Sequence, residues 1–135
     1  MKNNRAYLFP IAFCLYLTGV ALMCFLHGDK IPDVSGTWFG LPADKVAHSV
    51  MFFPFIPLSF QTFRSKSGSR LINLLILTLL MFLGLGTAYL TEVIQDKLSY
   101  RTYENKDLIA DSLGLGAGYA CTALWIIIRR SKRRR

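Results

Sequence analysis

Four long apolar stretches dominate the chain, at about residues 6–26, 46–63, 71–92 and 108–128. Crossing a hydrocarbon core of about 30 Å takes roughly 20 helical residues, and each stretch is close to that length. A helix satisfies its backbone polar groups within its own segment, as lipid requires. We therefore expect an all-α integral membrane protein with four transmembrane helices, forming a single domain over residues 1–135.

The composition favours the same fold class. Hydrophobic residues make up 53% of the 135 residues, and the mean hydropathy of +0.37 is high for a soluble domain of this size. The net charge of +8 is concentrated in residues 129–135, where six of seven residues are basic. No folded basic face accompanies this tail, so we expect no nucleic-acid partner. A basic cytoplasmic tail explains it better.

The basic residues also predict the orientation in the membrane. Eleven Lys and Arg residues lie in the two terminal segments and the 64–70 loop, whereas five lie in the other two loops. Loops rich in Lys and Arg stay in the cytoplasm. We therefore expect a multi-pass protein of the cell membrane with both termini cytoplasmic. All eight acidic residues fall on the opposite, outer side or just beneath it.

Polar side chains recur in pairs at the expected outer ends of three stretches. The members of each pair are three or four residues apart, so they share a helix face. The pairs are Asp44 with His48, Glu92 with Gln95, and Asp107 with Asp111. Ionisable groups in a span are costly unless they are paired or face a polar cavity. We therefore expect His48, Glu92 and Asp107 to converge within roughly 10 Å of a common point, with Arg101 folded over them.

Simpler explanations for the same residues stay open. An acid in the first turn of a helix, such as Asp44, is stabilised by the helix dipole. A lone histidine near a helix start is often only hydrogen-bonded. Buried acids such as Glu92 and Asp111 would equally be explained by structural pairing with Arg101 or Lys45.

An ordered set of motifs runs through the polar pairs: "DKVAH" at 44–48, "EVIQ" at 92–95, Arg101, and "DLIADSLG" at 107–114. This set resembles the VanZ-like family of small bacterial membrane proteins. The family pattern is roughly Asp-Lys-x-x-His, then Glu-x-x-Gln, then Arg, then Asp-x-x-x-Asn-x-x-Gly. The resemblance covers about residues 44–118, more than half of the chain.

The resemblance implies a bacterial cell-envelope protein, and a role in antibiotic resistance of the teicoplanin type. The family takes its name from a protein linked to resistance to that glycopeptide. One departure is visible at Asp111, where the family pattern often has Asn. An amide both donates and accepts hydrogen bonds, whereas an ionised carboxylate only accepts them.

The leading functional hypothesis is a non-catalytic pocket on the outer side of the membrane. Its ligand would be an envelope lipid, a glycolipid or a lipidated glycopeptide antibiotic. The two basic residues would meet phosphate or carboxylate groups, and the others would form hydrogen bonds. The expected ligand-binding residues are Asp44, Lys45, His48, Glu92, Gln95, Arg101, Asp107 and Asp111.

The alternative is an intramembrane enzyme that acts on a lipid-linked envelope precursor. His48, Glu92 and Asp107 are the catalytic candidates, with a general-base role suited to His48 or Glu92. A divalent-metal version with Asp44 as a further ligand is chemically compatible. No metal motif is recognisable, however, so no metal site is predicted and the cofactor is left open. A third class of possible function is a carrier or a small partner subunit of a larger assembly.

Small residues and prolines predict how the helices pack. Gly114 with Gly118, and Gly84 with Ala88, have the four-residue spacing that lets helix backbones approach closely. These faces could serve convergence of the chain's own helices or a homo-oligomer. Pro54 and Pro57 should kink the second span.

Overall fold

The computed structural model describes residues 5–25, 36–66, 69–98 and 104–131. Within these ranges the chain is helical apart from short connections and one β-hairpin. The elements are α1 (Arg5–Phe25), β1 (Thr37–Trp38), β2 (Leu41–Pro42), α2 (Ala43–Phe52), α3 (Phe55–Phe63), α4 (Arg70–Asp96) and α5 (Asn105–Ser131).

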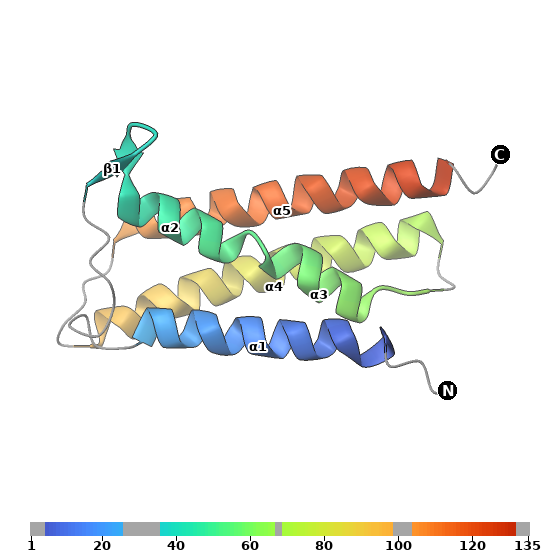
Figure 1. Cartoon of the computed structure of the whole chain (residues 1–135), viewed down its shortest axis with the longest axis horizontal. Coiled ribbons are helices and arrows are strands. Elements are labelled where there is room, and N and C mark those ends of the chain that lie inside the picture. Colours follow the sequence, from blue (N-terminus) through green and yellow to red (C-terminus); the bar gives the residue numbers. More distant parts are fainter. Residues whose placement is uncertain (1–4, 26–35, 67–68, 99–103, 132–135) are drawn as a thin grey trace.

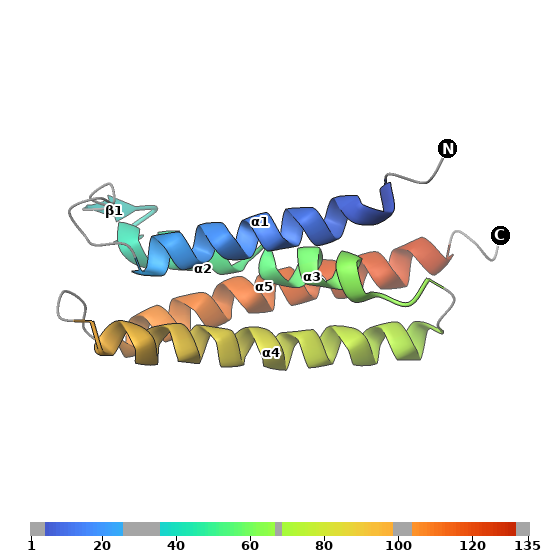
Figure 2. The ribbon, with the colours of Figure 1, turned by 90° about the horizontal axis from the view of Figure 1, so that it is seen from below.

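The helices form one elongated bundle, with their axes roughly along its long dimension (Figures 1 and 2). One end of the bundle, the basic end, carries Arg64, Arg70 and Arg129; α1 begins and α5 ends there (Figure 1). At the opposite, acidic end, α2 and α5 begin and α4 ends, which brings Glu92 and Asp107 to the same level of the bundle.

Four segments are long and apolar enough to cross a membrane: Tyr7–Phe25, Ala43–Phe63, Arg70–Asp96 and Asn105–Arg129. They match the four predicted stretches, although the last three begin earlier and the last two also end later. The reason is that a helix does not stop where hydropathy falls, because its backbone hydrogen bonds continue through charged residues. The predicted tail is accordingly shorter, since α5 continues to Ser131.

The second membrane-length segment is broken into two helices, as we predicted from its prolines. α2 ends at Phe52 and α3 begins at Phe55, with Pro54 between them. Pro57 lies in the first turn of α3, where a missing N–H costs nothing. Near this break the hydroxyl of Tyr16 in α1 donates to the carbonyl oxygen of Met51 at 2.8 Å. The polar backbone at the break is thus partly satisfied by a neighbouring helix, as a break within lipid requires.

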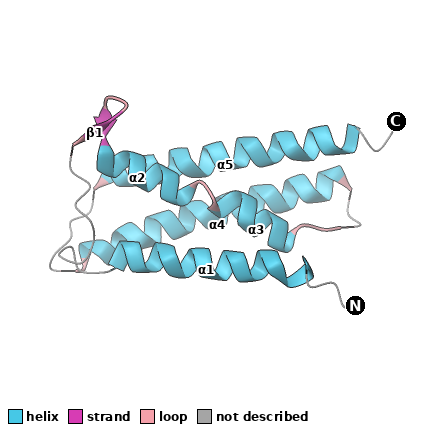
Figure 3. Cartoon of the chain, in the orientation of Figure 1, coloured by secondary structure: helices cyan, strands magenta, loops and turns pink. Residues whose placement is uncertain are grey.

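A short β-hairpin precedes α2 and was not part of the all-α expectation, which the predominantly helical structure otherwise bears out (Figure 3). β1 and β2 pair antiparallel, with Thr37 opposite Pro42 and Trp38 opposite Leu41. The two turn residues have positive φ angles, 55° at Phe39 and 79° at Gly40, as two-residue turns of this kind need. Strands of two residues are too short to show an alternating pattern, so they could not be predicted from the sequence.

Close packing of α5 against α2 and α3 depends on two of the glycines at which close helix approach was predicted. A Cβ atom at Gly114 would collide with the backbone carbonyl of Ser49, and one at Gly118 with that of Phe53. Gly84 of α4 is also covered, by side chains of α3 and α5. These faces are occupied by the chain's own helices, so a homo-oligomer would have to use other surfaces.

The interior of the bundle is apolar, and so is much of its surface. Fully buried side chains of α2 to α5 form the core: Phe52, Ile56, Phe60, Leu77 and Leu115. On α1, the ring of Phe13 packs edge-on against Phe55 and Phe63. Large apolar side chains also point outward along the whole bundle, among them Leu15, Leu79, Phe82, Leu113 and Leu124. An outward surface of this kind is expected of helices surrounded by lipid.

Candidate functional site

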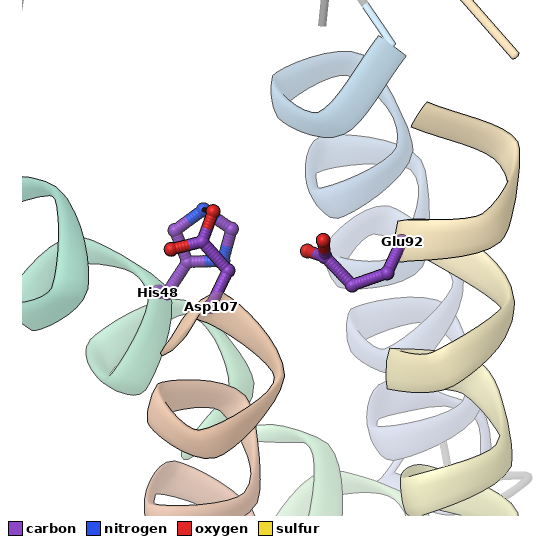
Figure 4. Close-up of side chains that lie close together, drawn as sticks. All are labelled: His48, Glu92 and Asp107. Atoms are coloured by element: carbon purple, nitrogen blue, oxygen red, sulfur yellow. Dashed lines mark ion pairs between the residues drawn. The ribbon is translucent and has the colours of Figure 1, made fainter. Parts of the chain in front are cut away.

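Three helices bring polar side chains together at the acidic end (Figure 4). One ligand atom each from His48 of α2, Glu92 of α4 and Asp107 of α5 lie within 4.8 Å of one another. Glu92 is almost wholly buried, with 1% of its surface exposed. The predicted convergence of these three residues is confirmed.

The local sequence explains why these side chains meet. Asp107 lies in the first turn of α5, as Asp44 does in α2. His48 is one turn further along α2, and Glu92 lies about one turn before the end of α4. All of them are therefore at a similar depth from the acidic end. Asp44 and Asp107 are also stabilised by the helix dipole, because both lie in the first turn of a helix. Their positions are therefore explained by the helix dipole as well as by their part in the polar site.

His48 is held between two carboxylates of α5. Its Nδ1 lies 2.9 Å from Oδ1 of Asp111, which is fully buried. Its Nε2 lies 3.7 Å from Oδ2 of Asp107. An ionised carboxylate only accepts hydrogen bonds, so Nδ1 carries the proton given to Asp111, and Nε2 faces Asp107. Among the described residues, the partner of Asp111 is therefore His48 rather than Lys45.

Lys45 is surrounded by three carboxylates. Its Nζ lies 2.8 Å from Oδ2 of Asp44 and 2.6 Å from Oε2 of Glu104, and it also contacts Oδ1 of Asp107. The sequence predicted that Lys45 would contact an anionic group of a ligand, and that role stays a prediction. The chain's own acids already compensate this charge.

Glu104 is a site residue that the sequence reasoning missed. Its half-exposed carboxylate contacts Lys45, and its backbone N–H donates to Oε2 of Glu92 at 3.4 Å. One signal could have identified it: Glu104 precedes Asp107 by three residues, so both can lie on the same side of the first turn of α5.

Two carboxylate oxygens in this region have no hydrogen-bond partner among the described residues. They are Oε1 of Glu92 and Oδ2 of Asp111, and both are buried. A buried polar atom without a partner costs free energy. Such atoms usually indicate a ligand, an ion or a water molecule that completes the site.

The other predicted site residues have different positions. Gln95 is buried, and its Nε2 donates to the carbonyl oxygen of Cys24 in α1 at 3.0 Å. It therefore connects α4 to α1 rather than to the carboxylates. Asp44 is half-exposed beside Lys45. Arg101 lies outside the described residues, so its predicted place over the site stays a prediction.

We call the seven charged and titratable side chains at this end the acidic cluster. Its five carboxylates face one lysine and one histidine. Fully ionised, the cluster has an excess of negative charge even when His48 is protonated. It therefore favours ligands that bring positive charge or hydrogen-bond donors. The members are Asp44, Lys45, His48, Glu92, Glu104, Asp107 and Asp111.

An apolar groove lies between α2 and α5 beside the cluster. It has a volume of about 280 Å³ and is lined by Ser49, Val50, Phe53, Leu113, Gly114 and Ala117. The hydroxyl of Ser49 donates to the carbonyl of Ala110 at 2.7 Å, so the one polar side chain of the lining is already satisfied. Because Ser49 directly follows His48, the groove begins within one helical turn of the cluster.

Comparison of the chain with protein-family models, curated proteins and solved structures gave no match. The resemblance to the VanZ-like family therefore depends on the motifs of the sequence. What the chain does has to be inferred from the cluster and from the groove beside it.

Proposed function

We propose that this chain is a multi-pass membrane protein, resembling the VanZ-like family, that binds an amphiphilic envelope molecule at the extracytoplasmic side of the membrane. The polar part of the ligand would meet the buried carboxylates of Glu92 and Asp111 in the acidic cluster, and an acyl chain would lie in the apolar groove. The observation that carries the proposal is the pair of buried oxygens of Glu92 and Asp111, which have no partner among the described residues. Such oxygens call for hydrogen-bond donors from outside the described part of the chain.

The charge of the cluster narrows the class of ligand. Lys45 is compensated by three acids, so a headgroup that offers only phosphate would meet more repulsion than attraction. Hydroxyl and amine groups would instead donate to the free carboxylate oxygens. A glycolipid or a lipidated glycopeptide antibiotic combines such donors with an acyl chain. A role in glycopeptide resistance would follow if the second of these is bound.

The orientation can be tested with introduced cysteines. The basic end carries both the start of α1 and the end of α5, so we place both termini in the cytoplasm. After Cys14, Cys24 and Cys121 are replaced by alanine, Thr37→Cys should react with a membrane-impermeant maleimide in intact cells. Lys66→Cys should react only after the cells are permeabilised. The reverse pattern would move the acidic cluster to the cytoplasm.

Ligand binding can be tested with Glu92→Gln, which keeps the size of the side chain and removes its charge. Hydrogen bonds to a charged group contribute about 1.5–3 kcal/mol, so binding should weaken roughly 10- to 100-fold. The measurement is a titration of the protein in nanodiscs with diglucosyl diacylglycerol or with teicoplanin. His48→Ala and Asp107→Asn should weaken binding similarly.

The matched control for Glu92→Gln is Glu104→Gln. It makes the same chemical change in the same cluster, but Glu104 is half-exposed and its charge is directed to Lys45. Its effect on binding should stay below about threefold, as for most solvated charges. Equal affinities of the wild-type chain and Glu92→Gln would rule out the pocket. Teicoplanin without its acyl chain should bind more weakly if the groove holds that chain.

The pairing of His48 with Asp111 favours a second candidate, an intramembrane enzyme acting on a lipid-linked precursor. A buried carboxylate on Nδ1 fixes the imidazole and leaves Nε2 as a general base. Here Nε2 faces Asp107. Incubation of the nanodisc protein with a lipid-linked disaccharide precursor separates the two candidates. Products that His48→Ala does not form would identify an enzyme, whereas a ligand recovered unchanged supports binding alone.

A further inference from the structure

Part of the acidic cluster has the arrangement of a metal centre. One ligand atom each from His48, Glu92 and Asp107 lie within 4.8 Å of one another, and they come from three different helices. Two ligands of one tetrahedral zinc ion are roughly 3–3.5 Å apart, given bonds of about 2.0–2.2 Å. The separation of 3.7 Å between Nε2 of His48 and Oδ2 of Asp107 is too long for a hydrogen bond but close to this value. Small side-chain rotations would place the three atoms around one ion.

The hydrogen bond of His48 prepares its other nitrogen for a metal. When the carboxylate of Asp111 is ionised, Nδ1 donates to it, and the lone pair of the neutral imidazole is then on Nε2, on the side of Asp107. Histidines that bind metals commonly donate their second N–H to a carboxylate, which fixes the tautomer and the ring orientation. Asp111 is therefore a positioning residue for His48 in this arrangement.

Glu92 supplies an independent observation that points to a ligand. Its Oε1 is buried without a partner among the described residues, and its carboxylate points from α4 toward His48 and Asp107 (Figure 4). A divalent cation would satisfy this oxygen and offset part of the negative charge of the cluster. Lys45 contacts the other oxygen of Asp107, so Oδ2 of Asp107 remains available to the ion.

We propose that His48, Glu92 and Asp107 bind a divalent transition-metal ion, Zn²⁺ or Mn²⁺. One imidazole nitrogen with two carboxylate oxygens suits these ions, whereas Mg²⁺ and Ca²⁺ prefer oxygen ligands alone. Three protein ligands leave a further position for water or a bound molecule. This proposal does not depend on the amphiphile, because it concerns the chain's own ligand atoms.

A second group of acids nearby does not make a metal site. Asp44, Glu104 and Asp107 also bring three oxygens within 4.8 Å of one another. The ammonium group of Lys45 contacts all three of these side chains, so a cation of the chain already holds this place. Asp44 and Glu104 therefore provide matched controls, since they are acids of the same cluster outside the proposed ligand set.

The test uses the full-length protein in detergent, stripped of metal with EDTA and studied without added lipid. Titration with ZnCl₂ against a fluorescent zinc chelator should show one ion bound per chain. Glu92→Gln and His48→Ala should lower the affinity at least about 100-fold, and Asp111→Asn about 10- to 100-fold through the orientation of His48. Asp44→Asn and Glu104→Gln should change it less than about threefold. Mn²⁺ should give an electron paramagnetic resonance spectrum of a protein-bound ion, which the Glu92→Gln chain lacks.

Three results would overturn the metal proposal. They are no binding of Zn²⁺ or Mn²⁺ by the wild-type chain, equal binding by Glu92→Gln, and an equal loss in Asp44→Asn, which would indicate a diffuse acidic surface. Thermal midpoints of the metal-free variants show whether each one is folded. Glu92→Gln keeps the shape of the side chain, so it decides the question even if His48→Ala does not fold.

Discussion

Replacing Gly114 by valine is expected to abolish the folded bundle. The valine Cβ would be built into the backbone carbonyl of Ser49, and backbone cannot rotate away as a side chain can. α2 and α5 would have to separate where the hydroxyl of Ser49 donates to Ala110. We expect a loss of at least about 3 kcal/mol, the upper end for overpacking. The measurement is the thermal midpoint and the monodisperse elution of the protein in a mild detergent.

Gly116→Val is the matched control. It makes the same substitution one half-turn away in α5, where a Cβ would meet nothing within 4 Å. Any loss of helix propensity is shared by the two variants, so the difference between them reports the contact with α2. If Gly114→Val elutes and melts like Gly116→Val, the close crossing of α2 and α5 is wrong.

Replacing Lys45 by methionine is expected to destabilise the acidic end strongly. Methionine keeps the apolar length of the side chain but leaves Asp44, Glu104 and Asp107 without the cation that they share. Removing one partner of a buried ion pair costs about 3–5 kcal/mol. We expect about 2 kcal/mol here, because Asp44 and Glu104 are half-exposed and screened by solvent. The thermal midpoint at low salt is the measurement.

The salt dependence of Lys45→Met gives a second check. The repulsion among the three acids left without their cation is screened by added salt, so it weakens at high ionic strength. The deficit in stability relative to the wild-type chain should therefore shrink as salt is added. Lys106→Met removes the same charge from an exposed position of α5 and should cost less than about 0.5 kcal/mol. A deficit that is independent of salt would contradict the electrostatic explanation.

The helices could be predicted from the sequence because each stretch has the length and apolar composition that crossing a membrane would require. The convergence of His48, Glu92 and Asp107 could also be predicted, since each lies near the expected outer end of its stretch. Pro54 predicted the break between α2 and α3 because proline lacks a backbone N–H and has a fixed ring. All three features follow from residue types within one segment.

What the sequence could not supply is the register between helices. His48 and Asp111 are separated by 63 residues and Lys45 and Asp107 by 62, so no local pattern links either pair. Gln95 also shows that a local pattern does not predict which neighbouring helix a side chain contacts. It shares a helix face with Glu92, yet the rotation of α4 directs Glu92 to α5 and Gln95 to α1. The neighbour that each side chain meets depends on how closely α5 packs against α2 at the glycines of α5.

The long sequence separation of these pairs has a consequence for biosynthesis. α5 carries Asp107 and Asp111, and it is the last of these helices to leave the ribosome. Until it is inserted, Lys45 and His48 have no acid of α5 beside them, and Glu92 has no backbone N–H from Glu104. Polar groups without partners are costly in lipid. The contacts of Lys45 and His48 with Asp107 and Asp111 can therefore form only after α5 has been synthesised and has packed against α2.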